Sequence, residues 1–340
     1  MRNKHLLLTL LFLLACTCQS SAHAQPLLRI TGMVRQPLSL TLQDLERYQS
    51  LQVQLNEVME DGSYRGAFYY TGVPLRTLLE AASIQKEGAT FSKRIDMAIR
   101  IGNEKGKQVA LSWGEVFYRN PGRIIVATSA SPVIPHKDCG SCHTPERYKP
   151  RLDKLKRVID FPKLVVTGDA YAERSLEGVT SIELLDVCPT MPTQKMEKLF
   201  SPEFTIMGTK AGTLNFKDLS RYPRRTIKVK HLGEGRGYHG ISTYKGAIFK
   251  AVLEEIGLPF DLNLVFLVSA DDGYRSLFSY GEIFLDPSGE RMIMADTIDG
   301  GPIKRGGKFM LVLPDDLMSD RDVKAVKKIE VISLQPDPKP

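Results

Sequence analysis

Residues 70–84 of the chain are YTGVPLRTLLEAASI, and residues 244–258 are YKGAIFKAVLEEIGL. The two stretches match at an offset of 174 residues, which indicates that the chain carries two copies of one structural unit. In both stretches the later apolar residues follow three- and four-residue spacing, which predicts a short amphipathic helix. The second helix is expected to end at Gly257.

Three further blocks repeat in the same order along the chain, so we infer a duplication with two domains. We predict a first repeat over residues 26–187, a linker over 188–199 that contains two prolines, and a second repeat over 200–335. The matching blocks are LTLQDLERY (40–48) with LNFKDLSRY (214–222), SWGEVF (112–117) with SYGEIF (279–284), and PKLVVTGD to VTSIELLDV (162–187) with FMLVLPDD to VKKIEVISL (309–334).

Between the predicted helices, the segments LLRITGMV (27–34), VQLNEV (53–58) and RIDMAIRIG (94–102) alternate apolar and polar residues. This alternation predicts strands with one buried face. Each of the two predicted repeats therefore alternates strand-like and helix-like segments. Asp44 and Asp218 each follow the start of a predicted short helix, so we expect capping or surface roles for their carboxylates.

The order of these motifs resembles the molybdopterin-binding domain of the sulfite oxidase superfamily, over most of the chain. The first repeat carries the resemblance in Thr71-Gly72-Val73-Pro74-Leu75. The second carries it in Asp272-Gly273-Tyr274, Gly300-Gly301-Pro302 and Lys327-Lys328-Ile329-Glu330. The resemblance implies the fold class α+β, with two tandem mixed α/β repeats, and a molybdenum ion bound through one cysteine thiolate.

That thiolate is missing from both repeats. The corresponding stretches, residues 46–70 and 220–244, contain no cysteine. His231 lies close to the expected position in the second repeat, but an imidazole is a poor replacement for a soft anionic ligand. The sequence therefore predicts a molybdopterin-type scaffold that does not bind the molybdenum cofactor.

The N-terminus predicts export. Arg2 and Lys4 precede an apolar run that is too short to cross a bilayer. Cleavage after Ala24 would follow the small-residue rule and give a signal peptide of residues 1–24, whereas Leu13-Leu14-Ala15-Cys16 resembles a bacterial lipoprotein box with a lipid anchor at Cys16. We expect a periplasmic or otherwise exported bacterial protein without a transmembrane segment.

Removal of residues 1–24 takes away two positive charges, so the formal charge falls from +7 to +5. The remaining charges are interspersed, and no basic tract with interleaved aromatic residues is present. Nucleic acid is therefore not an expected partner.

Residues 139–143 are CGSCH, the attachment sequence of c-type haem. Thiols separated by two residues can bond the two vinyl groups on one edge of the porphyrin, and the next histidine can then reach the iron. We predict one covalent haem c attached through Cys139 and Cys142, with His143 as the iron ligand.

Other chemistries of the same residues stay open at this point. His136, Cys139, Cys142 and His143 have the ligand count of a zinc site. A disulfide could join Cys139 to Cys142, or one of them to Cys188, in an oxidising compartment. Comparison of the repeats places the motif in an insertion at about residues 135–160 of the first repeat, which favours a grafted site on a rigid scaffold.

The sixth haem ligand is not determined by the sequence. Candidates are His231, His239, Met191, Met196 and His136. A bound sixth ligand would favour electron transfer, whereas an open position would allow ligand binding or peroxidase-type chemistry.

The sequence thus favours an exported monohaem c-type cytochrome that transfers electrons to or from a periplasmic redox protein. No catalytic residues are predicted, and whether the protein is also an enzyme of the oxidoreductase class stays open. The alternatives are a molybdopterin-dependent oxidoreductase with haem as an electron relay, and a non-redox binding module with a zinc or disulfide loop.

Overall fold

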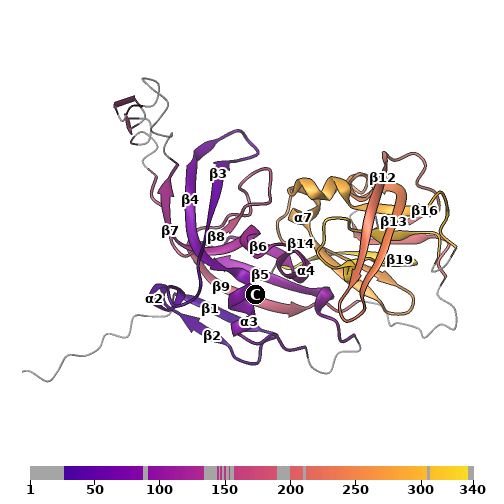
Figure 1. Ribbon diagram of the computed structural model, residues 1–340, viewed down its shortest axis with the longest axis horizontal. Helices are drawn as coiled ribbons and strands as arrows, with labels where there is room; N and C mark the ends of the chain where they lie inside the picture. The colour runs from indigo at the N-terminus through magenta and orange to yellow at the C-terminus, as the bar shows by residue number, and fades with distance from the viewer. Residues whose placement is uncertain are drawn as a thin grey trace, which may run out of the picture.

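The computed structural model describes residues 27–335 except 87–90, 134–143, 145, 148, 151–152, 154–156, 190–199, 210–211 and 305–306. Two halves lie side by side along the long axis of the molecule, the first running from β1 to β9 and the second from β10 to β19 (Figure 1). The elements of the first half are β1 (Leu28–Gly32), β2 (Leu38–Leu40), α2 (Leu42–Leu45), β3 (Leu51–Val58), β4 (Tyr64–Pro74), α3 (Leu75–Ala81), β5 (Met97–Asn103), β6 (Gln108–Ser112), α4 (Trp113–Phe117), β7 (Ile124–Pro132), β8 (Lys163–Val166) and β9 (Val179–Asp186). Those of the second half are β10 (Phe204–Thr209), β11 (Gly212–Phe216), β12 (Arg224–Gly233), β13 (Gly237–Ile248), α6 (Phe249–Glu254), β14 (Leu264–Ala270), β15 (Arg275–Ser279), α7 (Tyr280–Phe284), β16 (Ile293–Ile298), β17 (Gly301–Pro302), β18 (Met310–Val312) and β19 (Val326–Ser333). Short 3₁₀ turns are η1 (Arg94–Asp96), η2 (Pro121–Arg123), η4 (Pro287–Arg291) and η5 (Ser319–Arg321).

The two halves have the same strand order. A five-stranded sheet runs β2-β1-β9-β5-β6 in the first half and β11-β10-β19-β14-β15 in the second. In each sheet one pair is parallel, β1 with β9 and β10 with β19, and the other pairs are antiparallel. A second sheet, β3-β4-β7-β8, has its counterpart in β12-β13-β16 with β18 paired to β16. The limits predicted for the two repeats and the linker stay predictions.

The prediction of a balanced α+β fold is wrong. Within the described residues, strands account for 46% and helices for 17%, and the helices are short. The short helices predicted in the two matching stretches are present as α3 and α6, with 7 and 6 residues, but each directly follows a long strand, β4 up to Pro74 and β13 up to Ile248. Helices of one or two turns gain little from internal hydrogen bonds, so strand pairing determines the architecture.

The glycine of each TGV or KGA stretch explains why these residues stay extended. A Cβ on Gly72 would lie 2.2 Å from the carbonyl oxygen of Val126, and one on Gly246 would lie 2.2 Å from that of Met294. Both glycines lie at an irregularity in strand pairing, of β4 with β7 and of β13 with β16. Glycine therefore allows a close approach of two strands at the same place in both halves.

Each half has its own apolar core, and a further cluster joins them. Ala98, Ala110 and Val187 of the first half pack with Val265, Leu267 and Leu277 of the second. Every residue of β14 and β15 is buried, because one face covers its own core and the other faces this shared cluster. The apolar contact between the halves fixes α4 and α7 close to their boundary (Figure 1).

Candidate functional site

The predicted haem-binding residues Cys139, Cys142 and His143 lie outside the described residues. The strands on either side of them are well defined. β7 and β8 pair antiparallel, with Ile124 opposite Val166, and residues 133–162 connect them. The corresponding strands of the second half, β16 and β18, are connected by the shorter stretch 299–309, which includes β17.

Arg157 anchors the return of this connection to the scaffold. Its guanidinium Nη2 donates to Glu57 Oε2 on β3 at 2.9 Å, and it also forms an ion pair with Glu177. Its side chain is 18% exposed, and that of Glu57 is 2% exposed. A second and exposed ion pair, Lys105 with Asp160 at 3.0 Å, joins the connection to the turn after β5.

Glu57 is the centre of a buried polar cluster. The hydroxyl of Tyr70 and the ammonium of Lys163 both donate to it, and Lys163 also donates to the Tyr70 oxygen at 3.0 Å. Tyr70 and Lys163 are 0% and 1% exposed. Burial, with the hydrogen bond to Glu57, raises the pKa of Tyr70 far above its ordinary value. Lys163 is neutralised by two carboxylates, so the cluster stabilises the sheet and offers no free nucleophile.

His231, a predicted sixth-ligand candidate, lies at the position that corresponds to Glu57. Val53 pairs with Tyr70 in the first half, and Ile227 pairs with Tyr244 in the second, so the two hairpins share one register. His231 Nε2 lies 3.4 Å from the Tyr244 hydroxyl. Burial, and then the charge of Lys324, lower the pKa of His231, so its ring is neutral at pH 7.

Of the other candidate ligands, only His239 lies within the described residues. His239 is exposed on β13, and His136, Met191 and Met196 lie outside the described residues. β12 and β13, which carry both described histidines of the second half, lie at the opposite end of the molecule from β7, where the connection with the haem motif begins (Figure 1).

Cys188 is exposed just after β9 and forms no disulfide with any other described residue. In the part of the chain that the structure describes, no group of three or more histidine, cysteine, aspartate or glutamate side chains could hold a metal ion. None of the described helices has both the length and the apolar character that crossing a bilayer requires.

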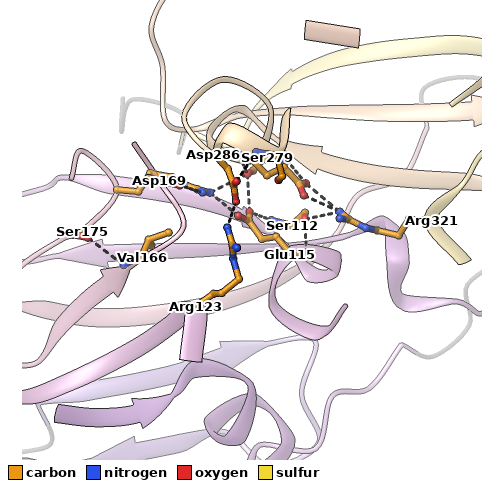
Figure 2. A network of polar contacts seen from close by, with 12 residues as sticks. Ser112, Glu115, Arg123, Val166, Asp169, Ser175, Ser279, Asp286 and Arg321 are labelled. Atoms are coloured by element: carbon orange, nitrogen blue, oxygen red, sulfur yellow. Dashed lines mark hydrogen bonds and ion pairs between the residues drawn. The ribbon is translucent and has the colours of Figure 1, made fainter. Parts of the chain in front are cut away.

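The boundary between the halves carries a polar network that sequence reasoning missed (Figure 2). Arg174 donates to both oxygens of Asp169, at 2.7 and 2.6 Å, and to Glu115 Oε2 at 2.6 Å. It also reaches Ser279 of the other half at 3.2 Å. Arg174 is 1% exposed, so all of its charge is compensated inside the protein.

Arg321 makes the same set of contacts from the second half. It donates to both oxygens of Asp316, at 2.7 and 2.9 Å, to Glu282 at 2.9 Å, and to Ser112 of the first half at 3.2 Å. Ser112 and Ser279 also begin α4 and α7 as capping boxes with Glu115 and Glu282. The serine of each repeated S-x-G-E block therefore caps its own helix and also accepts a hydrogen bond from the arginine of the other half.

Burial dominates the electrostatics of this network. It raises the pKa of Glu282 to about 7, although Arg321 acts against it, and it also raises the pKa of Asp169. Arg123 extends the network to Asp286 of the second half with an ion pair of 2.5 Å. With every arginine matched to a carboxylate, this network holds the halves together and leaves no group free for chemistry.

Spacing in the sequence carried a signal for these arginines. Asp169 and Asp316 are the last residues of the repeated blocks LVVTGD and LVLPDD. Arg174 and Arg321 each follow that aspartate by five positions. Their partners Glu115 and Glu282 lie in a different repeated block, so only the folded chain shows which carboxylates they meet.

No protein-family model matches the chain, and no curated protein matches it. Among solved structures, the chain is similar to the sulfane dehydrogenase SoxCD from Paracoccus pantotrophus, with 13% sequence identity and a TM-score of 0.31. The similarity covers 87% of this chain and 77% of that chain. At this TM-score the likeness carries no conclusion about fold or function.

Proposed function

We propose that the protein is an exported c-type cytochrome that carries one covalent haem and transfers electrons to or from a periplasmic redox protein. The observation that carries the proposal is the motif Cys139-Gly140-Ser141-Cys142-His143. Each cysteine S–H would add across one vinyl C=C, forming one C–S and one C–H bond, and His143 would supply the proximal nitrogen.

The scaffold supports this proposal through the way it holds both ends of the connection. β7 and β8 are paired within one sheet, and Arg157 returns the connection to the buried Glu57. A rigid scaffold that presents a longer connection in one half only is the usual setting of a grafted functional site.

An alternative of another class is a molybdopterin-dependent oxidoreductase with haem as relay. Among the described residues the only cysteine is Cys188, and it is exposed, so none of them offers the buried soft thiolate that molybdenum requires. Glu57 and His231, which occupy matching strand positions, are hard or borderline ligands and already have partners. The described residues therefore do not fit a molybdenum centre.

The test is expression of the full chain with cytochrome maturation proteins, followed by visible spectroscopy and intact mass under denaturing conditions. The proposal expects a Soret band and a mass increase of one haem that survives denaturation. The double variant Cys139→Ser/Cys142→Ser should lose both, while the matched control Cys188→Ser should keep both.

Other outcomes identify the alternatives. A colourless chain that retains one zinc after dialysis would overturn the haem assignment in favour of a zinc-binding loop. A colourless chain lighter by two hydrogen atoms would indicate a disulfide instead. A haem-containing chain that also retains stoichiometric molybdenum would favour the enzyme over the electron carrier.

A further inference from the structure

A cavity of about 640 Å³ lies beside α4, near the boundary between the halves. Its wall combines α3, the segment that follows it, α4 and Glu234 of the β12–β13 hairpin. This volume is in the range of sites that bind small organic molecules. The lining is rich in polar and charged groups, so its ligand chemistry can be derived from the side chains.

Trp113 is part of the wall of this cavity. The residue is 6% exposed and its ring stacks on Phe117, with centroids 4.5 Å apart. Its indole Nε1 is buried, so the N–H group does not face the cavity, and Trp113 contributes aromatic surface to the wall.

Four cationic side chains line the same cavity, and two of them lack an acidic partner. Lys86 is paired with Asp96 and Asp186, and Arg76 is paired with Glu80 at 2.8 Å. The remaining two form only neutral contacts with described residues: Arg35 donates to the Gln85 side-chain oxygen at 3.4 Å, and Arg94 donates to the Ile84 carbonyl at 3.2 Å.

Neither acid of the wall forms an ion pair with Arg35 or Arg94. Glu80 is engaged by Arg76, and Glu234 forms a hydrogen bond with the Tyr118 hydroxyl. The Glu234 backbone N–H donates to Asp320 at 2.8 Å, which holds the second half against this wall. Among the described residues, Arg35 and Arg94 therefore have no acidic partner, and their guanidinium groups can bind an anionic ligand.

Arg35, Arg94 and Trp113 belong to the first half, and the second half has the same strands without the residue types of Arg94 and Trp113 at the matching positions. Ala98 pairs with Ser112 as Val265 pairs with Ser279, so Arg94 corresponds to Asp261 and Trp113 to Tyr280. The second half thus has an acid where the first has an arginine, and no indole. Because the fold is retained without these residues, their presence in the first half is not a requirement of folding.

We propose that this cavity binds a small organic dianion, a dicarboxylate or a phosphate ester. Its anionic oxygens engage Arg35 and Arg94. Guanidinium groups bind carboxylate and phosphate oxygens through paired hydrogen bonds, which suits both ligand types. The proposal does not rest on the haem assignment.

The chain contains one tryptophan, so its fluorescence reports on this cavity directly. The full chain, with its haem where present, is titrated with succinate and with phenyl phosphate at constant ionic strength, by tryptophan emission and by calorimetry. Calorimetry is independent of any absorption of the emission by haem. The neutral diamide of succinate and added sodium chloride are the ligand controls.

The expected result is saturable binding of one dianion per chain for at least one of the two probes, with the stronger probe identifying the ligand type. Arg35→Gln and Arg94→Gln should each weaken binding about tenfold or more, since each removes a charged hydrogen-bond donor from the site. Both arginines are exposed, so their variants should fold, which circular dichroism verifies.

The matched control is Arg65→Gln, which removes one exposed positive charge on the distant β4 strand and should change affinity less than about twofold. The proposal is overturned if neither probe saturates at millimolar concentration, or if the diamide binds equally well. It is also overturned if Arg65→Gln weakens binding as much as Arg35→Gln, because the effect would then be nonspecific.

Discussion

Arg321 lies directly against Gly114, so closely that a Cβ on the glycine would be 2.2 Å from Cδ of the arginine. The arginine cannot move aside, since it is fully buried and bonded to Asp316 and Glu282. Arg174 lies against Gly281 at the same distance. Each repeated S-x-G-E block therefore needs a glycine at this position, because a side chain there would collide with the arginine of the other half.

We predict that Gly114→Ala and Gly281→Ala each destabilise the protein by at least about 1–3 kcal/mol, the usual cost of overpacking. Urea unfolding measures the change. Gly122→Ala is the matched control, because its Cβ would meet only ordinary contacts, the nearest at 3.7 Å. Equal stability of Gly114→Ala and Gly122→Ala would contradict the packing described here.

The buried charges of the network predict a second result. Arg321→Met removes the arginine partner of the buried Glu282, and it leaves Asp316 with Arg119 alone, at 3.1 Å. Loss of one partner of a buried pair typically costs ~3–5 kcal/mol. Arg47→Met, which breaks an exposed pair with Asp44, should cost less than about 1 kcal/mol.

The loss in free energy of unfolding caused by Arg321→Met should become smaller as pH falls. Glu282, left without its arginine, can then bind a proton and lose the charge that is costly to bury. Chemical unfolding at pH 5 and pH 8 compares the two conditions. A deficit that is the same at both values would mean that lost packing, and not buried charge, causes the destabilisation.

Asp322 predicts a pH dependence of its own. Its Oδ1 accepts from Leu313 N at 2.9 Å, while Oδ2 is buried without a hydrogen-bond partner among the described residues. Burial raises the pKa of Asp322 to about 8, above the ordinary 3.8. The folded state thus holds a proton that the unfolded chain releases, and stability decreases as pH rises from about 4 to about 8.

Asp322→Asn should remove this decrease in stability. The difference in free energy of unfolding between the variant and the natural protein should therefore shift in favour of the variant by a few kcal/mol from pH 5 to pH 8.5, at ~1.4 kcal/mol per pKa unit. Urea unfolding at both pH values tests the prediction. The control Asp61→Asn changes an exposed carboxylate whose pKa is lowered by hydrogen bonds to Ser63, and its effect should be equal at both values. A constant difference for Asp322→Asn would refute the prediction.

Local features of the fold followed from the sequence. The capping role expected of Asp44 is confirmed, since it forms a capping box with Thr41 at the start of α2. The strands predicted around residues 27–34, 53–58 and 94–102 correspond to β1, β3 and β5. These features depend on neighbouring residues only. They can therefore be predicted from the alternation of apolar and polar residues and from the spacing of capping residues.

The class of the fold and the boundary network did not follow from the sequence. The short helices predicted after Gly72 and Gly246 are present as α3 and α6, but strands β4 and β13 lead directly into them, and the pairing of these strands with β7 and β16 makes strand the dominant structure. Arg174 and Arg321 each have one local partner, an aspartate five positions earlier, but their other partners, such as Glu115 and Ser112, are distant in the chain and cannot be recognised from local spacing.

The last prediction concerns the connection that carries the haem motif. Arg157→Gln leaves Glu57 with one cation fewer in a buried cluster, so we expect a loss of ~1–3 kcal/mol. Lys105→Gln breaks the exposed pair with Asp160 on the same connection, where the side chains are 73% and 51% exposed, and should change stability little. Thermal unfolding compares the two. Because neither variant alters CGSCH, haem incorporation should be the same in both; loss of stability in Lys105→Gln equal to that in Arg157→Gln would show that Glu57 does not anchor the connection.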